Sequence, residues 1–296
     1  MVITRLIGGL GNQMFQYAVG RRLAHSLGVK LKLDITEFDD YKPRTFRTYS
    51  LGNFNIQENF ASLKEIAALK KPGTIEQVRV KLLHRPAIPP STYICEKKDG
   101  HFDPGIMKLP DNVYLEGYWQ SEKYFIDIAE IIRREFTVKV PQIGKNKELG
   151  EEIVSCESVS LHIRRGDYVS DAHTNKVHGC CGIDYYLRCV KLMNTKVKNA
   201  HFFAFSDEPE WVCDNLKLPY PMTVIDHNGA DKGYEDLRLM SQCRHHIISN
   251  SSFSWWGAWL NPRKDKKVFA PKQWFGKEKQ ATRRIDDLTP ATWVLA

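Results

Sequence analysis

The chain has 296 residues, enough for one large domain or two ordinary domains with a substantial core. Apolar residues make up 42% and charged residues 26%, which is typical of a soluble globular protein. The net charge is +8, from 43 Lys and Arg against 35 Asp and Glu, and such an excess favours phosphate-bearing ligands, nucleic acid or an anionic membrane surface. Because this charge is spread without a long basic run, nucleic acid is not the expected partner.

The N-terminal residues and the cysteines favour a cytoplasmic protein. The apolar run at residues 1–7 is too short for a signal peptide, and no later segment approaches the ~18 apolar residues that a membrane span needs. The seven cysteines are scattered and odd in number, and the adjacent pair Cys180 and Cys181 suits neither an ordinary disulfide nor a zinc site. The sequence has no D-x-D, so one common way of holding a metal with a nucleotide-sugar is missing.

The first half opens with a strand, a glycine turn and a helix. Residues 2–7 predict the strand, and a helical pattern of apolar residues begins near Asn12. Backbone N–H groups at such a helix start can meet an anion. The dinucleotide fingerprint fails, however, because Met14 stands where the third glycine belongs. Gly9 and Gly11 therefore line either an anion site or a tight packing turn, and Asn12 either binds sugar hydroxyls or caps the helix.

Further elements of the first half follow from local patterns. A capping box at Ser62 starts a helix that Pro72 ends, and Tyr118 with Trp119 is either a sugar platform or core. The polar segment 137–147 predicts the boundary between domains 1–145 and 146–296. The other predicted elements are strands at 30–34 and 113–116, a helix at 75–84 and an amphipathic helix after residue 121.

The second half alternates strands with helices, which predicts a parallel sheet covered on both faces. The predicted strands are 158–163, 201–205, 222–226, 245–249 and 267–270, and the predicted helices are 184–197, 208–216, 234–243 and 252–260. The carboxyl ends of parallel strands meet at one edge of the sheet, where ligands of such folds bind.

Three polar sets follow these strands at that edge. They are Arg164, Arg165 and Asp167 after the first strand, Asp207 and Glu208 after the second, and Ser251 and Ser252 before a tryptophan-rich helix. Paired guanidinium groups and a helix N-terminus suit a diphosphate, and carboxylates can accept the N–H donors of a guanine edge. Each set also has an ordinary explanation as surface ion pairs, helix caps or core, but their convergence favours a nucleotide-diphosphate site.

Five stretches of the chain, in order, resemble motifs of the α-1,2-fucosyltransferases of glycosyltransferase family 11. They are residues 8–18, 117–125, 162–168, 205–208 and 249–260. The most specific are His162-Ile163-Arg164-Arg165 and Trp255-Trp256-Gly257-Ala258-Trp259, and the match extends to about residue 275.

This resemblance implies an α/β, GT-B-like fold with two Rossmann-like domains facing a cleft. Residues 1–145 would form the acceptor side and residues 146–296 the GDP-fucose-binding domain. The implied reaction is the transfer of L-fucose from GDP-β-L-fucose to the 2-hydroxyl of a terminal β-galactose, with inversion and without a metal or other cofactor. The chain resembles a bacterial, cytoplasmic member of the family.

The resemblance also implies roles for single residues. Arg164 would contact the β-phosphate and stabilise its charge as the C1–O bond breaks, with His162 beside it. Asn12 would lie near fucose. Asp207 and Asp236 would bind guanine and its ribose, Ser251 and Ser252 the phosphates, and the matching motifs also contain Gly9, Gly11, Arg165 and Phe253.

The general base and the acceptor stay open. Related fucosyltransferases have a glutamate near the position of Ala172. In this chain Asp171 is adjacent to that position and Asp167 is closer to the arginines, so these two are the candidates for the base. The alternative is a loose transition state that needs no strong base. The acceptor is an O-antigen, a capsule repeat or a milk-type oligosaccharide, and a lipid-linked acceptor would bring peripheral membrane contact. The alternative functions are a fucosyltransferase of another linkage, a nicotinamide-dependent oxidoreductase and a non-catalytic glycan-binding protein.

Overall fold

The computed structural model describes residues 1–38, 47–71, 90–97, 100–276, 280 and 285–296, with the backbone alone at 167, 170 and 172–174. The chain forms two compact units, Met1–Glu135 and Phe136–Ala296, which we call the first and the second unit. The predicted domain boundary after residue 145 falls inside helix α5 (Gly144–Ser155) of the second unit. None of the described helices is both long and apolar enough to cross a membrane.

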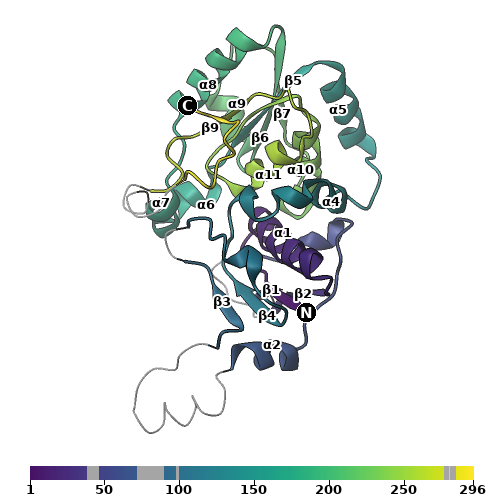
Figure 1. The fold of residues 1–296 in the computed structure, drawn as a ribbon. Helices are drawn as coiled ribbons and strands as arrows, with labels where there is room; N and C mark the ends of the chain where they lie inside the picture. Colours follow the sequence, from purple (N-terminus) through teal and green to yellow (C-terminus); the bar gives the residue numbers. More distant parts are fainter. Residues whose placement is uncertain (39–46, 72–89, 98–99, 277–279, 281–284) are drawn as a thin grey trace. The chain divides into compact units, whose positions relative to one another are not determined.

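The first unit contains a four-stranded parallel sheet in the order β2-β1-β4-β3 (Figure 1). Its strands are β1 (Val2–Arg5), β2 (Leu31–Asp34), β3 (Tyr93–Cys95) and β4 (Val113–Glu116). Its helices are α1 (Leu10–Leu27), α2 (Leu63–Lys70) and α4 (Ala129–Glu135), with short 3₁₀ turns η1 (Thr36–Phe38), η2 (Leu51–Asn53), η3 (Ile106–Lys108), η4 (Glu122–Tyr124) and η5 (Ile126–Ile128).

Alternation along the strands explains which helix covers which face of this sheet. Ile3 and Tyr114 pack with Leu69 of α2 in one buried cluster. On strand β1 the next residue, Thr4, points the other way, and its hydroxyl donates to the carbonyl of Gln16 in α1. The two helices therefore lie on opposite faces of the sheet.

Most predicted elements of the first unit are confirmed, including the capping box of Ser62 and Glu65. The predicted amphipathic helix after residue 121 is wrong in its first half, which forms η4 and η5 before α4 begins. Phe125, with φ −149°, interrupts the helical path between the two turns. Strand β3 was not predicted, and the predicted helix at 75–84 lies outside the described residues.

The second unit contains a six-stranded parallel sheet in the order β10-β9-β8-β5-β6-β7. Its strands are β5 (Glu157–Ile163), β6 (Ala200–Ser206), β7 (Met222–Ile225), β8 (His245–Ile247), β9 (Val268–Ala270) and β10 (Val294–Leu295). Its helical elements are α5 (Gly144–Ser155), α6 (Gly166–Ser170), α7 (Ala172–His178), α8 (Ile183–Lys196), α9 (Pro209–Asn215), η6 (Ala230–Lys232), α10 (Gly233–Gln242) and α11 (Ser252–Leu260).

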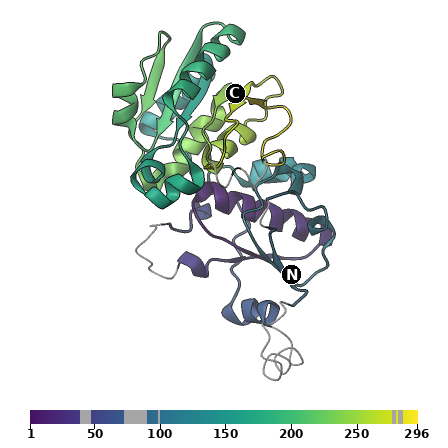
Figure 2. The same ribbon diagram turned by 90° about the vertical axis from the view of Figure 1, so that its left-hand side faces the viewer.

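Helices cover both faces of this sheet (Figure 2). Apolar residues of α8 and α9 pack on one face, and residues of α5 and α10 pack on the other. Trp255 and Trp256 of α11 are fully buried, with ring centres 5.1 Å apart, so the tryptophan motif belongs to the core. All predicted strands and helices of this half are confirmed within a few residues. Helix α5 was not predicted, and its first residues fall in the predicted linker 137–147.

Candidate functional site

Three adjacent strands of the second unit bring the predicted polar sets to one sheet edge. Strand β5 pairs in parallel with β6, where Ile163 lies opposite Ser206, and with β8, where Leu161 lies opposite Ile247. The segments that begin at residues 164, 207 and 248 therefore leave the sheet from the same edge. This confirms the predicted convergence of the polar sets on the carboxyl edge.

Asp207 holds Arg164 and its loop in place. Its Oδ2 lies 3.0 Å from a guanidinium nitrogen of Arg164, and its Oδ1 accepts the backbone N–H of Arg165 at 2.9 Å. A Cβ atom on Gly166 would lie only 2.3 Å from Oδ2, so the glycine makes this close approach possible. Asp207 thus orients Arg164, and its predicted contact with guanine stays a prediction.

Arg165 is held differently from its neighbour. Its Nε donates to Glu208 at 2.9 Å, and its guanidinium carbon lies 3.7 Å from the ring centre of Trp211. Ion pairing and a cation–π contact therefore fix this side chain along the loop. A phosphate contact of Arg165 stays a prediction.

His162 is a neutral residue at the base of the site. Its ring is buried, and Nδ1 lies 2.8 Å from the hydroxyl of Ser249 while the ring packs near Phe253. Burial, together with the nearby positive charge of Arg164, lowers the pKa of His162 to about 3. His162 therefore acts as a hydrogen-bonding group near neutral pH and adds no positive charge.

Ser251 caps α11 as an ordinary N-cap residue. Its Oγ accepts the backbone N–H of Phe253 at 3.3 Å, and its carbonyl accepts the hydroxyl of Ser254. Ser252 is the first residue of the helix, so both serines lie where the positive end of the helix dipole meets the sheet edge. Their contacts with phosphate stay predictions.

Asp236 lies in α10 and is half-buried. Burial raises its pKa to about 6, and the adjacent Glu235 acts in the same direction, while a 2.7 Å hydrogen bond from Asn228 opposes the shift. The carboxyl group therefore changes its protonation state near pH 6. Its predicted contact with guanine or ribose is not tested.

The two base candidates follow Arg165 in sequence. Asp167 lies in the short helix α6, and its side chain is outside the described part of the chain. Asp171 is exposed between α6 and α7, and its carbonyl accepts the backbone N–H of Asn175 at 2.9 Å. Both stay candidates.

A cavity of about 300 Å³ lies beside this edge, at the ends of β8 and β9. It is lined by residues that include Cys180, Cys181, Asn250 and Lys272, but not by Arg164 or His162. Burial raises the pKa of both cysteines, that of Cys181 to about 12, so both are thiols near neutral pH. The described residues contain no group of three or more His, Cys, Asp or Glu side chains placed to hold a metal, and metal independence stays a prediction.

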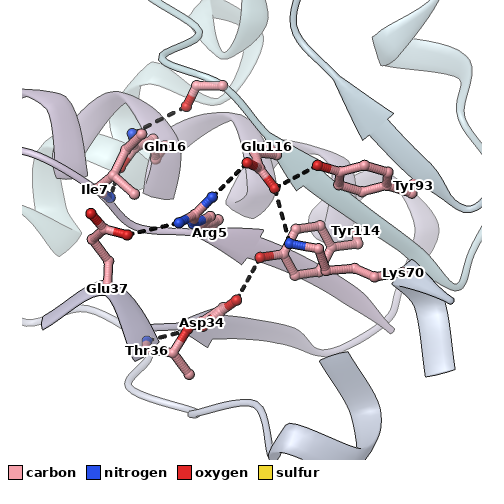
Figure 3. Close-up of polar contacts among 11 residues, drawn as sticks. Arg5, Ile7, Gln16, Asp34, Thr36, Glu37, Lys70, Tyr93, Tyr114 and Glu116 are labelled. Atoms are coloured by element: carbon pink, nitrogen blue, oxygen red, sulfur yellow. Dashed lines mark hydrogen bonds and ion pairs between the residues drawn. The ribbon is translucent and has the colours of Figure 1, made fainter. Parts of the chain in front are cut away.

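The first unit presents a network of paired charges at the corresponding edge of its own sheet (Figure 3). Arg5, the last residue of β1, bridges Glu37 at 2.7 Å and Glu116 at 2.5 Å. Lys70 and Tyr93 donate to the other oxygen of Glu116 at 3.1 and 2.8 Å. Burial acts to raise the pKa of Glu116, but these hydrogen bonds and the charge of Arg5 outweigh it and lower that pKa.

Buried amides hold the loops that leave this edge. The side chain of Gln16 accepts the N–H of Ile7 at 2.9 Å and donates to the carbonyl of Gly117 at 3.1 Å, which ties the loop after β1 to the loop after β4. Gln13 donates to the carbonyls of Gly8 and Thr48. Neither role was predicted, because both partners are backbone atoms of other elements.

In the glycine turn, the residue whose conformation requires glycine is Gly8, and the prediction had singled out Gly9 and Gly11. Gly8 has φ +74°, a conformation that favours glycine, whereas Gly9 is the N-cap of α1 and Gly11 is buried within the helix. Asn12 does not cap the helix; its Oδ1 accepts a hydrogen bond from Nε2 of Gln120 at 2.8 Å. An anion-binding role of Gly9 and Gly11 stays a prediction.

Known proteins resemble this chain in sequence. The model of glycosyl transferase family 11 matches residues 97–295. An α-1,2-colitosyltransferase of Escherichia coli is 35% identical over 99% of this chain and 98% of its own length. The O-antigen biosynthesis glycosyltransferase WbnK of E. coli is 31% identical over 95% of this chain and 97% of its own length. Galactoside α-(1,2)-fucosyltransferase 1 of the rat is 27% identical over 49% of this chain and 41% of its own length.

Solved structures resemble the fold. NodZ α-1,6-fucosyltransferase soaked with GDP-fucose gives a TM-score of 0.52 at 16% identity, covering 90% of this chain and 94% of that one. Arabidopsis thaliana FUT1 in complex with GDP gives 0.50 at 11% identity, covering 98% of this chain and 74% of that one. These similarities confirm the α/β, GT-B-like fold class.

The family model and the full-length bacterial relatives indicate the same family as the sequence motifs. Because these relatives are glycosyltransferases, they argue against a nicotinamide-dependent oxidoreductase and against a non-catalytic glycan-binding protein. The chain belongs to glycosyltransferase family 11 and is a bacterial-type member of it.

Proposed function

We propose that this enzyme transfers L-fucose from GDP-β-L-fucose to the 2-hydroxyl of a terminal β-galactoside, forming an α-1,2 linkage with inversion. The names of the relatives support this proposal. The colitosyltransferase is named for α-1,2 transfer, and the rat relative is named for α-(1,2) transfer of fucose to a galactoside.

The position of Arg164 is the observation that carries this proposal. Its guanidinium leaves the end of β5, is oriented by Asp207 and is 23% exposed. The N-terminus of α11 follows the adjacent strand β8 and carries Ser251 and Ser252. A guanidinium beside a helix N-terminus favours the two phosphates of a nucleoside diphosphate.

This arrangement suggests how the leaving group is stabilised. As the C1–O bond of the donor breaks, negative charge accumulates on the β-phosphate, where Arg164 and the helix dipole of α11 would oppose it. The oxygen of the acceptor 2-hydroxyl forms the new bond to C1 from the opposite face, and GDP departs. We propose that this chemistry needs no metal.

The acceptor proton requires a separate destination. Asp167 and Asp171 are the two base candidates, and a loose transition state that loses the proton to water is the alternative. An Asp171→Asn variant tests Asp171 as the base, because a general base contributes about 10²–10⁴-fold to the rate. A smaller effect on kcat removes Asp171 from the mechanism.

Transfer of colitose is a second candidate, favoured by the 35% identity to the colitosyltransferase over nearly the whole chain. Colitose is L-fucose without its 3-hydroxyl, so a site for one sugar differs from a site for the other by few contacts. Competition between GDP-fucose and GDP-colitose for one acceptor distinguishes them. A donor whose kcat/KM is about tenfold higher is the natural one.

We also propose that the acceptor is a β-galactoside of a bacterial surface polysaccharide. WbnK is named for O-antigen biosynthesis, which supports this choice. We place the enzyme in the cytoplasm, with peripheral contact at the inner membrane through a lipid-linked acceptor. The net charge of +8 would favour an anionic surface.

The decisive experiment incubates purified enzyme with GDP-fucose and lactose, with and without EDTA, and identifies the product by NMR. We expect a 2-linked α-fucosyl galactose in both samples. Product that disappears with EDTA contradicts metal independence. An enzyme that neither binds nor hydrolyses GDP-fucose contradicts the donor, and hydrolysis without transfer contradicts the acceptor.

A further inference from the structure

The loop after β4, residues 117–120, has a strained backbone conformation. Trp119 has φ +55°, in the left-handed region that non-glycine residues rarely adopt. Gly117 has no room for a side chain, because a Cβ atom there would lie 2.3 Å from the Cβ of Glu96 and 2.9 Å from the ring of Trp119. Backbone strain of this kind is found most often at sites that bind or react.

Glu96 holds the loop in this conformation. It follows β3, the neighbour of β4, and its carboxylate accepts the backbone N–H groups of Tyr118 at 2.8 Å and Trp119 at 2.9 Å. The indole of Trp119 is 1% exposed and packs edge-on against Tyr124, and its N–H has no hydrogen-bond partner among the described residues. Trp119 therefore belongs to the core, as one of the two predictions had it, whereas Tyr118 is 38% exposed.

The strained loop directs Gln120 toward the start of α1. Its Nε2 donates to Oδ1 of Asn12 at 2.8 Å. On the other side of the same amide, a Cβ atom on Gly8 would lie 2.8 Å from Nδ2 of Asn12. The hydrogen bond from Gln120 therefore orients the oxygen of the Asn12 amide, and the missing side chain of Gly8 leaves room for its nitrogen.

The carbonyl of Gln120 is an open hydrogen-bond acceptor. The side chain is half-buried, and its bond to Asn12 is the one polar contact it makes within the described residues. The amide carries no charge and follows the carboxyl end of a parallel strand, the usual position of a ligand. An uncharged acceptor of this kind suits the hydroxyl of a neutral sugar, and Tyr118 of the same loop is exposed.

We propose that Gln120 binds the acceptor sugar, with its carbonyl accepting a hydrogen bond from a hydroxyl of the neutral galactoside while its NH₂ group positions Asn12. This inference rests on the proposed function. It adds the residue of the first unit that recognises the acceptor and assigns Glu96 the role of holding the loop that carries it.

A Gln120→Met variant tests the proposal, because methionine keeps the length of the side chain and removes both polar atoms. We expect the KM for lactose to rise about tenfold, as for one lost hydrogen bond, and the KM for GDP-fucose to change by a smaller factor, from the loss of the bond that positions Asn12. Gln57→Met is the matched control, since Gln57 is exposed in the same unit. An unchanged lactose KM, or a donor KM that rises equally, overturns the proposal.

Galactosides deoxygenated at position 3, 4 or 6 keep the reacting 2-hydroxyl, so they identify the bound hydroxyl and separate binding from a general disturbance of the loop. The analogue that lacks the bound hydroxyl should lose about tenfold in kcat/KM with the wild-type enzyme and less than twofold further with Gln120→Met. Equal losses for both enzymes with every analogue overturn the proposal. A wild-type enzyme that neither binds nor hydrolyses GDP-fucose contradicts the proposed function itself, and this inference fails with it.

Discussion

The two units carry different chemistry at the same position of the same architecture. In the second unit, Arg164 leaves the sheet edge beside the carboxylate of Asp207 and stays 23% exposed. In the first unit, Arg5 lies between two carboxylates, and buried amides such as Gln16 hold the loops. The edge of the second unit therefore suits an incoming negative charge, and the edge of the first unit suits a neutral ligand. A parallel sheet thus fixes where a ligand binds, and the residues that end its strands decide which ligand it is.

The carboxylates that the structure places around each arginine distinguish Arg164 from Arg5. A guanidinium has five N–H donors, so Arg164 can keep Asp207 and still bind a phosphate. Arg5 already spans Glu37 and Glu116, and a phosphate there would meet two negative charges. The comparison therefore predicts that matched substitutions at these arginines affect different properties.

The largest expected effect comes from Arg164→Ala. Removing a preorganised donor to the leaving phosphate should lower kcat by about 10²–10³-fold and raise the KM for GDP-fucose, measured by product formation. Arg5→Ala is the matched control, which should lower the melting temperature and leave the donor KM within twofold. If Arg5→Ala raises the donor KM as much as Arg164→Ala does, the two edges do not differ as proposed.

A second prediction concerns the amides of the first unit. Gln16→Leu leaves the partly buried N–H of Ile7 and carbonyl of Gly117 without their partner. We expect a loss of about 2–3 kcal/mol in the free energy of unfolding, measured by urea denaturation. Gln57→Leu, at an exposed position, should change this free energy by less than about 0.5 kcal/mol. Equal losses from both variants would show that Gln16 does not hold the loops.

A third prediction uses two groups of the second unit whose pKa values shift in opposite directions. The pKa of Asp236 is raised from 3.8 to about 6, so the protonated carboxyl contributes stability that is full below pH 3.8 and lost as the pH rises through 6. The pKa of His162 is lowered from 6.5 to about 3, so its contribution is present above pH 6.5 and lost as the pH falls.

Asp236→Asn should therefore stabilise the protein above pH 6 and not at pH 4. Asparagine keeps an oxygen for Asn228 and removes the charge, and we expect a gain of about 1–2 kcal/mol at pH 7.5 after allowing for partial exposure. Melting temperatures between pH 4 and 8 measure it. A gain of the same size at every pH would show that ionisation of Asp236 is not the cause.

Sequence patterns predicted the edge of the second unit because that edge follows from local rules. Strand periodicity places the end of β5 and the start of α11, and parallel pairing then brings Arg164 and Ser251 to one side. The contact of Gln120 with Asn12 joins residues 108 positions apart and depends on the register of β1 with β4 and on the positive φ of Trp119. No short-range pattern contains that information. Helix α5 was missed for another reason, since its first residues belong to the polar segment 137–147, which resembles a linker.

The smallest predicted effect compares one cap in each unit. Ser251 caps α11, and Ser62 caps α2 through a capping box. Replacing either serine with alanine should cost about 1 kcal/mol in the free energy of unfolding, while Ser251→Gly should cost only a few tenths because glycine is a good N-cap.

The donor KM separates capping from phosphate binding at Ser251. A residue that only caps its helix changes stability alone, so Ser251→Ala and Ser62→Ala would then have the same donor KM. A serine that also donates to phosphate raises the KM for GDP-fucose about three- to tenfold in Ser251→Ala and in Ser251→Gly alike, because both variants lose the hydroxyl. The glycine variant is decisive, since it keeps most of the stability and removes only the hydroxyl. A normal donor KM in that variant would remove the Ser251 hydroxyl from the donor site and leave Arg164, Arg165 and Ser252 as the side chains predicted to bind phosphate.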